Sequence, residues 1–393
     1  MKNVVIAGYT RTPFHFAHKG ELVRVRPDDL AATAVKGLVE RTGVDPDDIE
    51  DLILGCAFPE AEQGFNMARL VVLLAGLPIT VAGTTINRFC GSSMQSIHFA
   101  AGAIQMNAGE VFICAGVESM SRVRIGGFNP MPNPVLYGHM PGAYMSMGET
   151  AENVGRKYQI TRTEQEEFAV ASQEKAAAAQ TNGRLDGEIV PIEMNGSSVD
   201  QDGCLRPGTT LDALAELKLA FDESGTVTAG TSSPLTDGAA AVLVCSEDYA
   251  KKHNLTPMVK ICSTAVAGCE PETMGLGPIF ASRKALSRAG IEANALDVIE
   301  INEAFATQSG GNGCRSLAGM GWTSTSVNAD GTRGCYMAGN PDLQPETSTN
   351  FELGTSWDRN GWALGATYFH TNFKNKIDYQ PLGFYNGFWW TRM

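Results

Sequence analysis

Hydrophobic and polar positions follow two alternating patterns over the first 300 residues of the chain. Short, often β-branched apolar runs predict strands, and longer segments with apolar residues every three to four positions predict helices. An alternation of this kind is typical of an α/β fold, which we expect up to about residue 308. The expected strands are Val4–Ala7, Leu52–Leu54, Thr84–Ile86, Val111–Ile113, Ala241–Val244 and Val298–Ile301.

Two helices can be bounded from the pattern. One is predicted to begin at Asp28 and Asp29 and to end near Gly43, and the other follows Cys90, with apolar residues at helical spacing as far as Ile104. Residues 120–207 are looser and rich in Pro, Met and Asn, with a polar helix expected at 162–182. We expect them to form a loop subdomain within an N-terminal half, residues 1–255.

One helix–turn–strand unit occurs twice. Residues 43–58 align without a gap to residues 290–305, an offset of 290 − 43 = 247. This repeat favours a duplicated α/β/α layered fold with two similar halves. The alternative is that any helix, turn and buried strand would look alike at this level.

The composition changes near the C-terminus. Residues 335–393 contain 13 aromatic residues in 59, or 22 %, whereas the preceding 334 contain 18, or about 5 %. We therefore expect an incomplete second half at 256–320 and a foreign, β-patterned tail at 321–393. In that tail, two extended runs flank Asn360 and Gly361, a pair that favours a hairpin turn.

Charge and cysteine content exclude several classes of protein. The 393-residue chain has a net charge of −13, which argues against a general nucleic-acid binder. Its nine cysteines show neither CxxC pairs nor regular spacing, so we expect reduced thiols of a cytoplasmic protein and no metal site. No run of 18 apolar residues suggests a membrane-spanning helix, and no secretory signal is expected at the N-terminus.

Cys90 is the main candidate for chemistry. It follows a predicted strand and precedes a predicted helix, where free N–H groups and the helix dipole are expected to lower the pKa of a thiol and favour the thiolate. The small residues Gly91, Ser92 and Ser93 would let a substrate approach the sulfur. Cys90 is thus either a nucleophile or, like most cysteines, a buried and inert residue.

Five motifs, in order, resemble those of the thiolase family. The first surrounds Cys90, and two short segments, Glu62–Asn66 and Gly268–Pro271, favour the degradative 3-ketoacyl-CoA type. The motifs are Ile86–Ser96, Gly116–Ser121, Met147–Val154, Thr226–Ser233 with Asp237–Ala240, and Asn302–Ala306.

The resemblance implies an acyltransferase with coenzyme A (CoA) as co-substrate, acyl-CoA as substrate and no permanently bound cofactor. Cys90 would carry the acyl group as a thioester, and Asn302 would help to hold a water or donor at an oxyanion site. The family also implies a homodimer or homotetramer. The positions that would line the CoA and substrate site are Met147, Arg206, Ser233 and Phe305.

The second half departs from this family. Thiolases carry a histidine in a Gly-His-Pro loop, which takes the proton of the nucleophile, and a cysteine in a Cys-x-Gly loop, which moves the substrate α-proton. Of the six histidines, only His370 follows Asn302, and its context differs; neither Cys314 nor Cys335 begins a Cys-x-Gly motif. At the repeat offset, position 337 (90 + 247) lies beside Gly339–Pro341, which resembles a degenerate Gly-His-Pro.

Residues 340–380 instead resemble the barrel region of TonB-dependent outer-membrane receptors, through the string Asn340–Glu346 and the hairpin after it. A membrane barrel needs at least about 8 strands, so this tail does not predict an outer-membrane role. The sequence indicates a thiolase-like body joined, between residues 307 and 340, to a receptor fragment. We expect thiolytic cleavage of 3-ketoacyl-CoA with impaired turnover, the alternative being a catalytically dead chimera that at most binds acyl-CoA.

Overall fold

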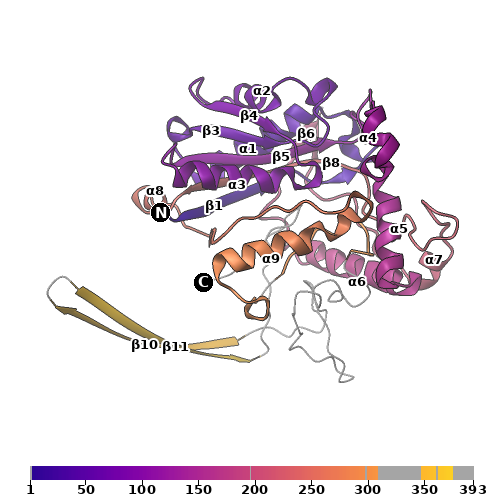
Figure 1. Ribbon diagram of the computed structural model, residues 1–393. Helices are drawn as coiled ribbons and strands as arrows, with labels where there is room; N and C mark the ends of the chain where they lie inside the picture. The colour runs from indigo at the N-terminus through magenta and orange to yellow at the C-terminus, as the bar shows by residue number, and fades with distance from the viewer. Residues whose placement is uncertain (1, 195, 297–298, 309–346, 360–361, 375–393) are drawn as a thin grey trace. The chain divides into compact units, whose positions relative to one another are not determined.

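The computed structural model describes residues 2–194, 196–296, 299–308, 347–359 and 362–374 (Figure 1). The chain divides into two units. One comprises Met1–Met337 with Leu382–Met393, and the other is Ala338–Pro381. Among the described residues, no helix combines the length and the apolarity that crossing a bilayer requires.

The larger unit is built on a mixed seven-stranded sheet. Its order is β4-β3-β5-β8-β1-β9, with β2 paired to β8. Strand β3 runs parallel to both β4 and β5, whereas β8 is antiparallel to β5 and β1. The strands are β1 (Val4–Arg11), β2 (His15–Phe16), β3 (Asp51–Gly55), β4 (Ala82–Ile86), β5 (Val111–Ser119), β8 (Thr236–Ser246) and β9 (Val259–Lys260).

Helices cover both faces of this sheet. Helices α1 (Pro27–Thr42) and α2 (Met67–Leu74) pack on one face with Leu52 and Leu54, and α3 (Ser92–Gln105) packs on the other with Ile53. Because neighbouring residues of a strand point to opposite faces, a strand buried on both sides is apolar at nearly every position. The predicted α/β class is confirmed.

Local signals fix the ends of these helices. Pro27 occupies the first turn of α1, and Gly43 ends the helix with a left-handed φ of 65°. The expected polar helix is α6 (Arg162–Thr181), whose capping box joins Thr161 and Glu164. The predictions for these helices are confirmed, as is the prediction for α3.

The segment after β5 contains mostly short elements. These are α4 (Pro134–His139), η5 (Pro141–Tyr144), α5 (Met147–Tyr158), α6, β6 (Ile192–Met194), β7 (Ser197–Val199) and α7 (Leu211–Ala215). The remaining short elements of the unit are η1 (Glu21–Arg24), η2 (Pro46–Asp48), η3 (Ala61–Gln63), η4 (Phe89–Gly91), α8 (Glu247–Lys252), η6 (Pro271–Leu276) and η7 (Ala293–Ala295).

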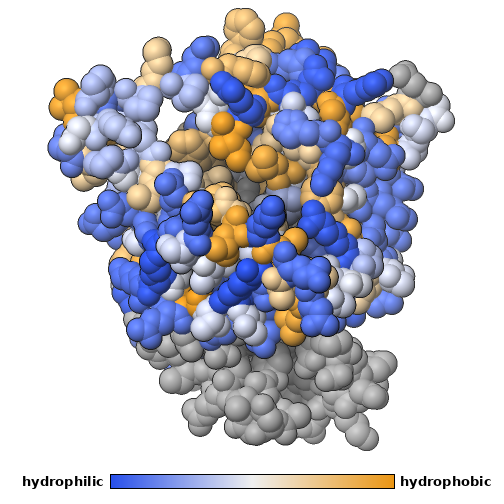
Figure 2. Space-filling view, turned by 90° about the vertical axis from the view of Figure 1, so that its right-hand side faces the viewer, coloured by the Kyte–Doolittle hydropathy of each residue, from blue (hydrophilic) through white to orange (hydrophobic). Residues whose placement is uncertain are grey.

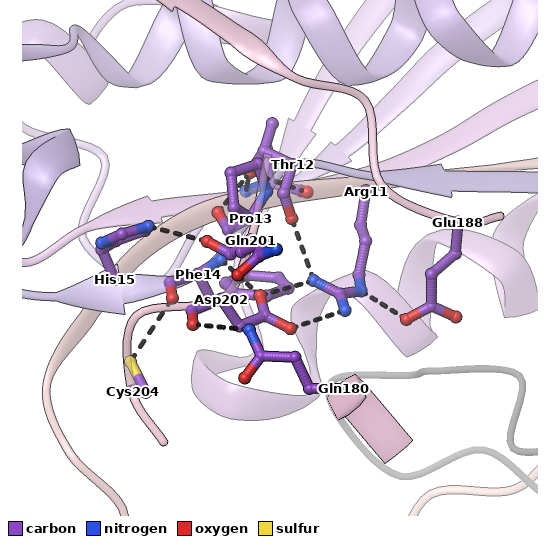
Figure 3. A network of polar contacts seen from close by, with 11 residues as sticks. Arg11, Thr12, Pro13, Phe14, His15, Gln180, Glu188, Gln201, Asp202 and Cys204 are labelled. Atoms are coloured by element: carbon purple, nitrogen blue, oxygen red, sulfur yellow. Dashed lines mark hydrogen bonds and ion pairs between the residues drawn. The ribbon is translucent and has the colours of Figure 1, made fainter. Parts of the chain in front are cut away.

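A buried ion-pair network ties this segment to β1 (Figure 3). Arg11, whose side chain is 7 % exposed, donates from Nε to Glu188 over 2.6 Å and from both Nη atoms to the Asp202 carboxylate over 2.7 Å. Burial lowers the pKa of Arg11, but the bonds to the two carboxylates outweigh it and raise the pKa overall. The network fixes residues 188–202 against the end of β1.

The internal repeat is reproduced only in part. Helix α9 (Gly277–Ala289) ends at Gly290 with φ 68°, as α1 ends at Gly43, and η7 lies 247 residues after η2. However, the described residues Ile299–Ile301 form no strand, whereas their counterparts belong to β3. The predicted strand Val298–Ile301 is therefore wrong over the described residues, and Val298 lies outside them.

The smaller unit contains the predicted hairpin. Strands β10 (Thr347–Arg359) and β11 (Trp362–Lys374) pair antiparallel, with Arg359 opposite Trp362 and Thr347 opposite Lys374. Asn360 and Gly361, the expected turn residues, lie outside the described residues. The proposed boundaries at 255, 320 and 321 stay predictions.

Helix α3 approaches the sheet so closely that glycine is required in β3. A methyl group at Gly55 would lie 2.5 Å from the backbone carbonyl carbon of Ser92. We therefore expect Gly55→Ala to lower the free energy of unfolding by about 1–3 kcal/mol, as overpacking does. Gly102→Ala, with open space around the new methyl group in the same helix, is the control and should raise stability by about 0.5–1 kcal/mol. Urea unfolding measures both, and equal midpoints for the two variants would contradict the close approach.

Candidate active site

Cys90 lies at the edge of the sheet where the parallel strands β3, β4 and β5 end. It follows β4 in the short turn η4, two residues before the start of α3, and it is exposed. Ligands of open α/β sheets bind at the carboxyl ends of such strands. Cys90 is therefore accessible at this edge, and the alternative of a buried cysteine does not hold for it.

The turn that carries Cys90 has an unusual backbone conformation. Phe89 adopts φ 46°, a left-handed value that a bulky residue rarely takes. Two short side chains hold it there: Asn87 Oδ1 accepts from the Phe89 N–H over 2.8 Å, and Ser92 Oγ accepts from the Arg88 N–H and donates to the Phe89 carbonyl, both over 2.7 Å. Strain maintained in this way is typical of functional sites.

The predicted lowering of the Cys90 pKa is wrong. Although the residue is exposed, neighbouring atoms partly shield its sulfur from water, and this desolvation raises the pKa of the thiol; the negative charge of Glu118 raises it further, whereas the N–H of Cys90 itself lowers it. Helix α3 begins only at Ser92, so its dipole acts at a greater distance than the sequence suggested. The surroundings of Cys90 thus disfavour the thiolate relative to a free cysteine.

The other free cysteines of the described residues differ in access. Cys56, Cys114 and Cys245 are buried, and burial raises the pKa of each thiol. Of the seven free cysteines described, only Cys90 and Cys262 are exposed. Cys262 offers a matched control, because it lies in a segment that carries none of the family motifs.

Three of the expected CoA-site residues meet in a second group. Met147, at the start of α5, packs with Phe305 against Ala151 and Val227. Ser233, which is exposed, donates its backbone N–H to Ala304 over 2.8 Å. The structure therefore brings Met147, Ser233 and Phe305 together from three motifs.

Phe221 belongs to this group and was missed from the sequence. Its ring meets that of Phe305 edge-on, with 5.8 Å between the ring centroids, and it is 42 % exposed. Phe221 stands outside the recognised motifs. A lone aromatic residue in an irregular segment gives no periodic signal, so only the fold reveals its contact.

Arg206 and Asn302 are placed apart from these groups. Arg206 is exposed, with its guanidinium 4.9 Å from the centroid of the Phe16 ring, and its backbone N–H is donated to Gln173. Asn302 is half-buried and lies three residues before Phe305. Within the described part of the chain, no hydrogen bond or ion pair joins Cys90, Asn302 and Arg206 to one another.

The face that carries α4 and its flanking loop exposes apolar side chains. Met131, Val135 and Tyr137 are 88, 74 and 56 % exposed. Figure 2 shows apolar side chains lying among hydrophilic ones on this face. The stretch from Ile125 to Gly148 itself contains no Asp, Glu, Lys or Arg, although Glu60 accepts from the Phe128 N–H over 2.6 Å.

The raised pKa of Cys90 predicts a steep pH dependence of its alkylation. Because only the thiolate reacts, the rate with iodoacetamide should rise about tenfold per pH unit from pH 6 to 9, without a plateau. Peptide mass spectrometry of the Cys90 and Cys262 peptides over a pH series measures this. An alkylation rate of Cys90 that is already constant between pH 6 and 8 would show a lowered pKa of this thiol and contradict the prediction.

Family models match three parts of the chain. "Thiolase, N-terminal domain" matches residues 4–248 and "Thiolase, C-terminal domain" residues 255–339. "TonB dependent receptor-like, beta-barrel" matches residues 301–389, so it overlaps the second thiolase match over 301–339. Both resemblances expected from the sequence are thereby confirmed.

Relatives and solved structures agree with the thiolase matches. The 3-ketoacyl-CoA thiolase of Bacillus subtilis is 44 % identical, over 87 % of this chain and 89 % of the relative, and that of Idiomarina loihiensis is 47 % identical over 79 % and 81 %. Human mitochondrial 3-ketoacyl-CoA thiolase in complex with CoA superposes with a TM-score of 0.73 at 36 % identity, over 81 % of this chain and 83 % of that one. The chain belongs to the thiolase family.

Proposed function

We propose that this chain is an acyl-CoA acyltransferase that cleaves 3-ketoacyl-CoA with CoA, in the degradative direction of fatty-acid β-oxidation. The observation that carries the proposal is the exposed Cys90 thiol, held in a strained turn at the edge where three parallel strands end. The names of the relatives support the substrate class. We place the reaction in the cytoplasm and expect a homo-oligomer.

The chemistry needs one nucleophile and two proton transfers. The Cys90 thiolate attacks C3 of the substrate, and the C2–C3 bond breaks, which leaves the acyl group on sulfur as a thioester. The electron pair of that bond goes to C2, which takes up a proton to give acetyl-CoA. The thiol of a second CoA then loses its proton, attacks the thioester and releases the shortened acyl-CoA together with the Cys90 thiolate.

The other candidate site residues supply only part of what these steps need. Met147, Ser233 and Phe305 provide an apolar group with one exposed hydroxyl, and we assign the CoA chain to it. Arg206 offers an exposed cation for a phosphate, and Asn302 an amide for an oxyanion site. The expected histidine and second cysteine of the family have no counterpart motif in the sequence, and the position that should carry them lies outside the described residues.

We propose that acylation of Cys90 proceeds while complete turnover is strongly reduced. Incubation with acetoacetyl-CoA should give an acetyl adduct in intact-mass measurements, because the Cys90 thiolate attacks C3 and solvent water can supply, slowly, the proton that C2 takes up when the C2–C3 bond breaks. Cys90→Ser should lose the adduct, and Cys262→Ser should retain it. An adduct that persists in Cys90→Ser would place the acylated residue elsewhere and overturn this assignment.

Turnover should fall by about 10²-fold or more relative to an intact relative such as the Bacillus subtilis enzyme, the usual loss when a general acid–base group is missing. The measurement is the thiolysis rate with acetoacetyl-CoA and CoA at equal enzyme concentration. A rate within tenfold of the relative would show that other groups move the protons. CoA binding by calorimetry without any adduct would instead support the alternative, a chain that only binds acyl-CoA.

A further inference from the structure

Glu118 lies at the centre of a hydrogen-bond cluster just behind the Cys90 turn. It is the penultimate residue of β5 and half-buried. Its carboxylate accepts from the Ala57 N–H over 2.8 Å, from the Phe58 N–H over 3.4 Å and from Gln63 Nε2 over 2.6 Å. One carboxylate therefore fixes two successive peptide groups that follow β3.

These two peptide groups in turn support the turn that carries Cys90. The Ala57 carbonyl accepts from Asn87 Nδ2 over 2.8 Å, and Asn87 Oδ1 accepts from the Phe89 N–H over 2.8 Å. The Phe58 ring lies against the Phe89 ring, with 6.0 Å between centroids. A continuous path thus runs from Glu118 through Ala57 and Asn87 to the residue before Cys90.

The path matters because Phe89 would not hold its conformation unaided. A left-handed φ is strained at a phenylalanine and persists only where the surroundings impose it. Phe89 is 64 % exposed, so core packing does not impose it. Its hydrogen bonds and its contact with Phe58 must do so.

We propose that Glu118 is a positioning residue for the Cys90 nucleophile, acting through Ala57, Phe58 and Asn87. The part of this proposal that concerns acyl transfer rests on the proposed function. Its effect on the turn itself can be measured without substrate.

Glu118 also affects the ionisation of Cys90. Whereas its hydrogen bonds support the turn that carries Cys90, its negative charge disfavours the Cys90 thiolate. The groups that face its carboxyl are the Cys56 thiol at the end of β3, Gln63 of η3 and the N–H groups of Ala57 and Phe58, with the Cys90 thiol of η4 within electrostatic reach. In the described part of the chain, no cation forms an ion pair with it. Burial raises the pKa of Glu118 and outweighs the hydrogen bonds that lower it. When ionised, the carboxylate opposes formation of the Cys90 thiolate.

Two variants and one control distinguish the positioning effect of Glu118 from the effect of its charge. Glu118→Gln removes the charge and turns one acceptor oxygen into a donor, which cannot bond to the N–H groups. Asn87→Ala breaks the same path without changing any charge. Glu110→Gln, an exposed glutamate just before the same strand, is the matched control.

We expect both Glu118→Gln and Asn87→Ala to speed hydrogen–deuterium exchange of the peptide spanning residues 86–92 by about tenfold or more, since the Phe89 N–H loses its fixed acceptor. Formation of the acetyl adduct, compared at equal thiolate fraction, should slow by about tenfold or more in both. Only Glu118→Gln should move the pH profile of Cys90 alkylation to lower pH. Glu110→Gln should match the unmodified chain in all three measurements.

Unchanged exchange in both variants would overturn the proposal. If Glu118→Gln does not fold, as judged by circular dichroism, Asn87→Ala carries the test alone, because its side chain is exposed. If the unmodified chain forms no adduct, the proposed function fails, while the exchange measurement still decides the positioning role.

Discussion

The close approach of α3 to the ends of β3 and β5 is the constraint on which the site depends. Side chains at Gly55 and Gly116 would meet Ser92 and Ser93, so both strands must lack a Cβ there for the helix to begin where it does. The helix then starts two residues after Cys90. A shift of α3 away from the sheet would carry Cys90 with it.

A second constraint holds the long insertion to the same sheet. Arg11 pairs with both Glu188 and Asp202, and Asp202 also accepts from the Phe14 N–H over 2.8 Å (Figure 3). Removing one partner of such a buried pair leaves an uncompensated charge. The folded state is then strongly destabilised, even where the intact pair adds little to its stability. The network therefore acts mainly by specifying where Glu188 and Asp202 lie relative to β1. Arg206 lies four residues beyond Asp202, with its guanidinium 4.9 Å from the centroid of the Phe16 ring.

Much of the fold could be predicted because its signals are local. Pro27 and Gly43 bound α1, and Thr161 with Glu164 begins α6, whatever these helices pack against. The pKa of Cys90 could not be predicted in this way. It depends on Glu118, 28 residues away in the sequence, and on shielding by neighbours that only the assembled sheet provides. Likewise, Phe221 joins Phe305 through a contact between segments that share no pattern.

The two copies of the repeat show which features local sequence signals determine and which depend on the rest of the fold. Gly43 and Gly290 end their helices with nearly the same φ, and a 3₁₀ turn follows each at the same spacing. These features need only a few neighbouring residues, and both copies have them. A strand needs partners: β3 lies between β4 and β5, whereas Ile299–Ile301 have no such pair among the described residues. Asn302, which follows directly, thus lacks the strand that would fix its position. Cys90 is held by a repeat copy whose strand is paired on both sides, whereas the described residues of the second copy form the helix and the turn but not the strand.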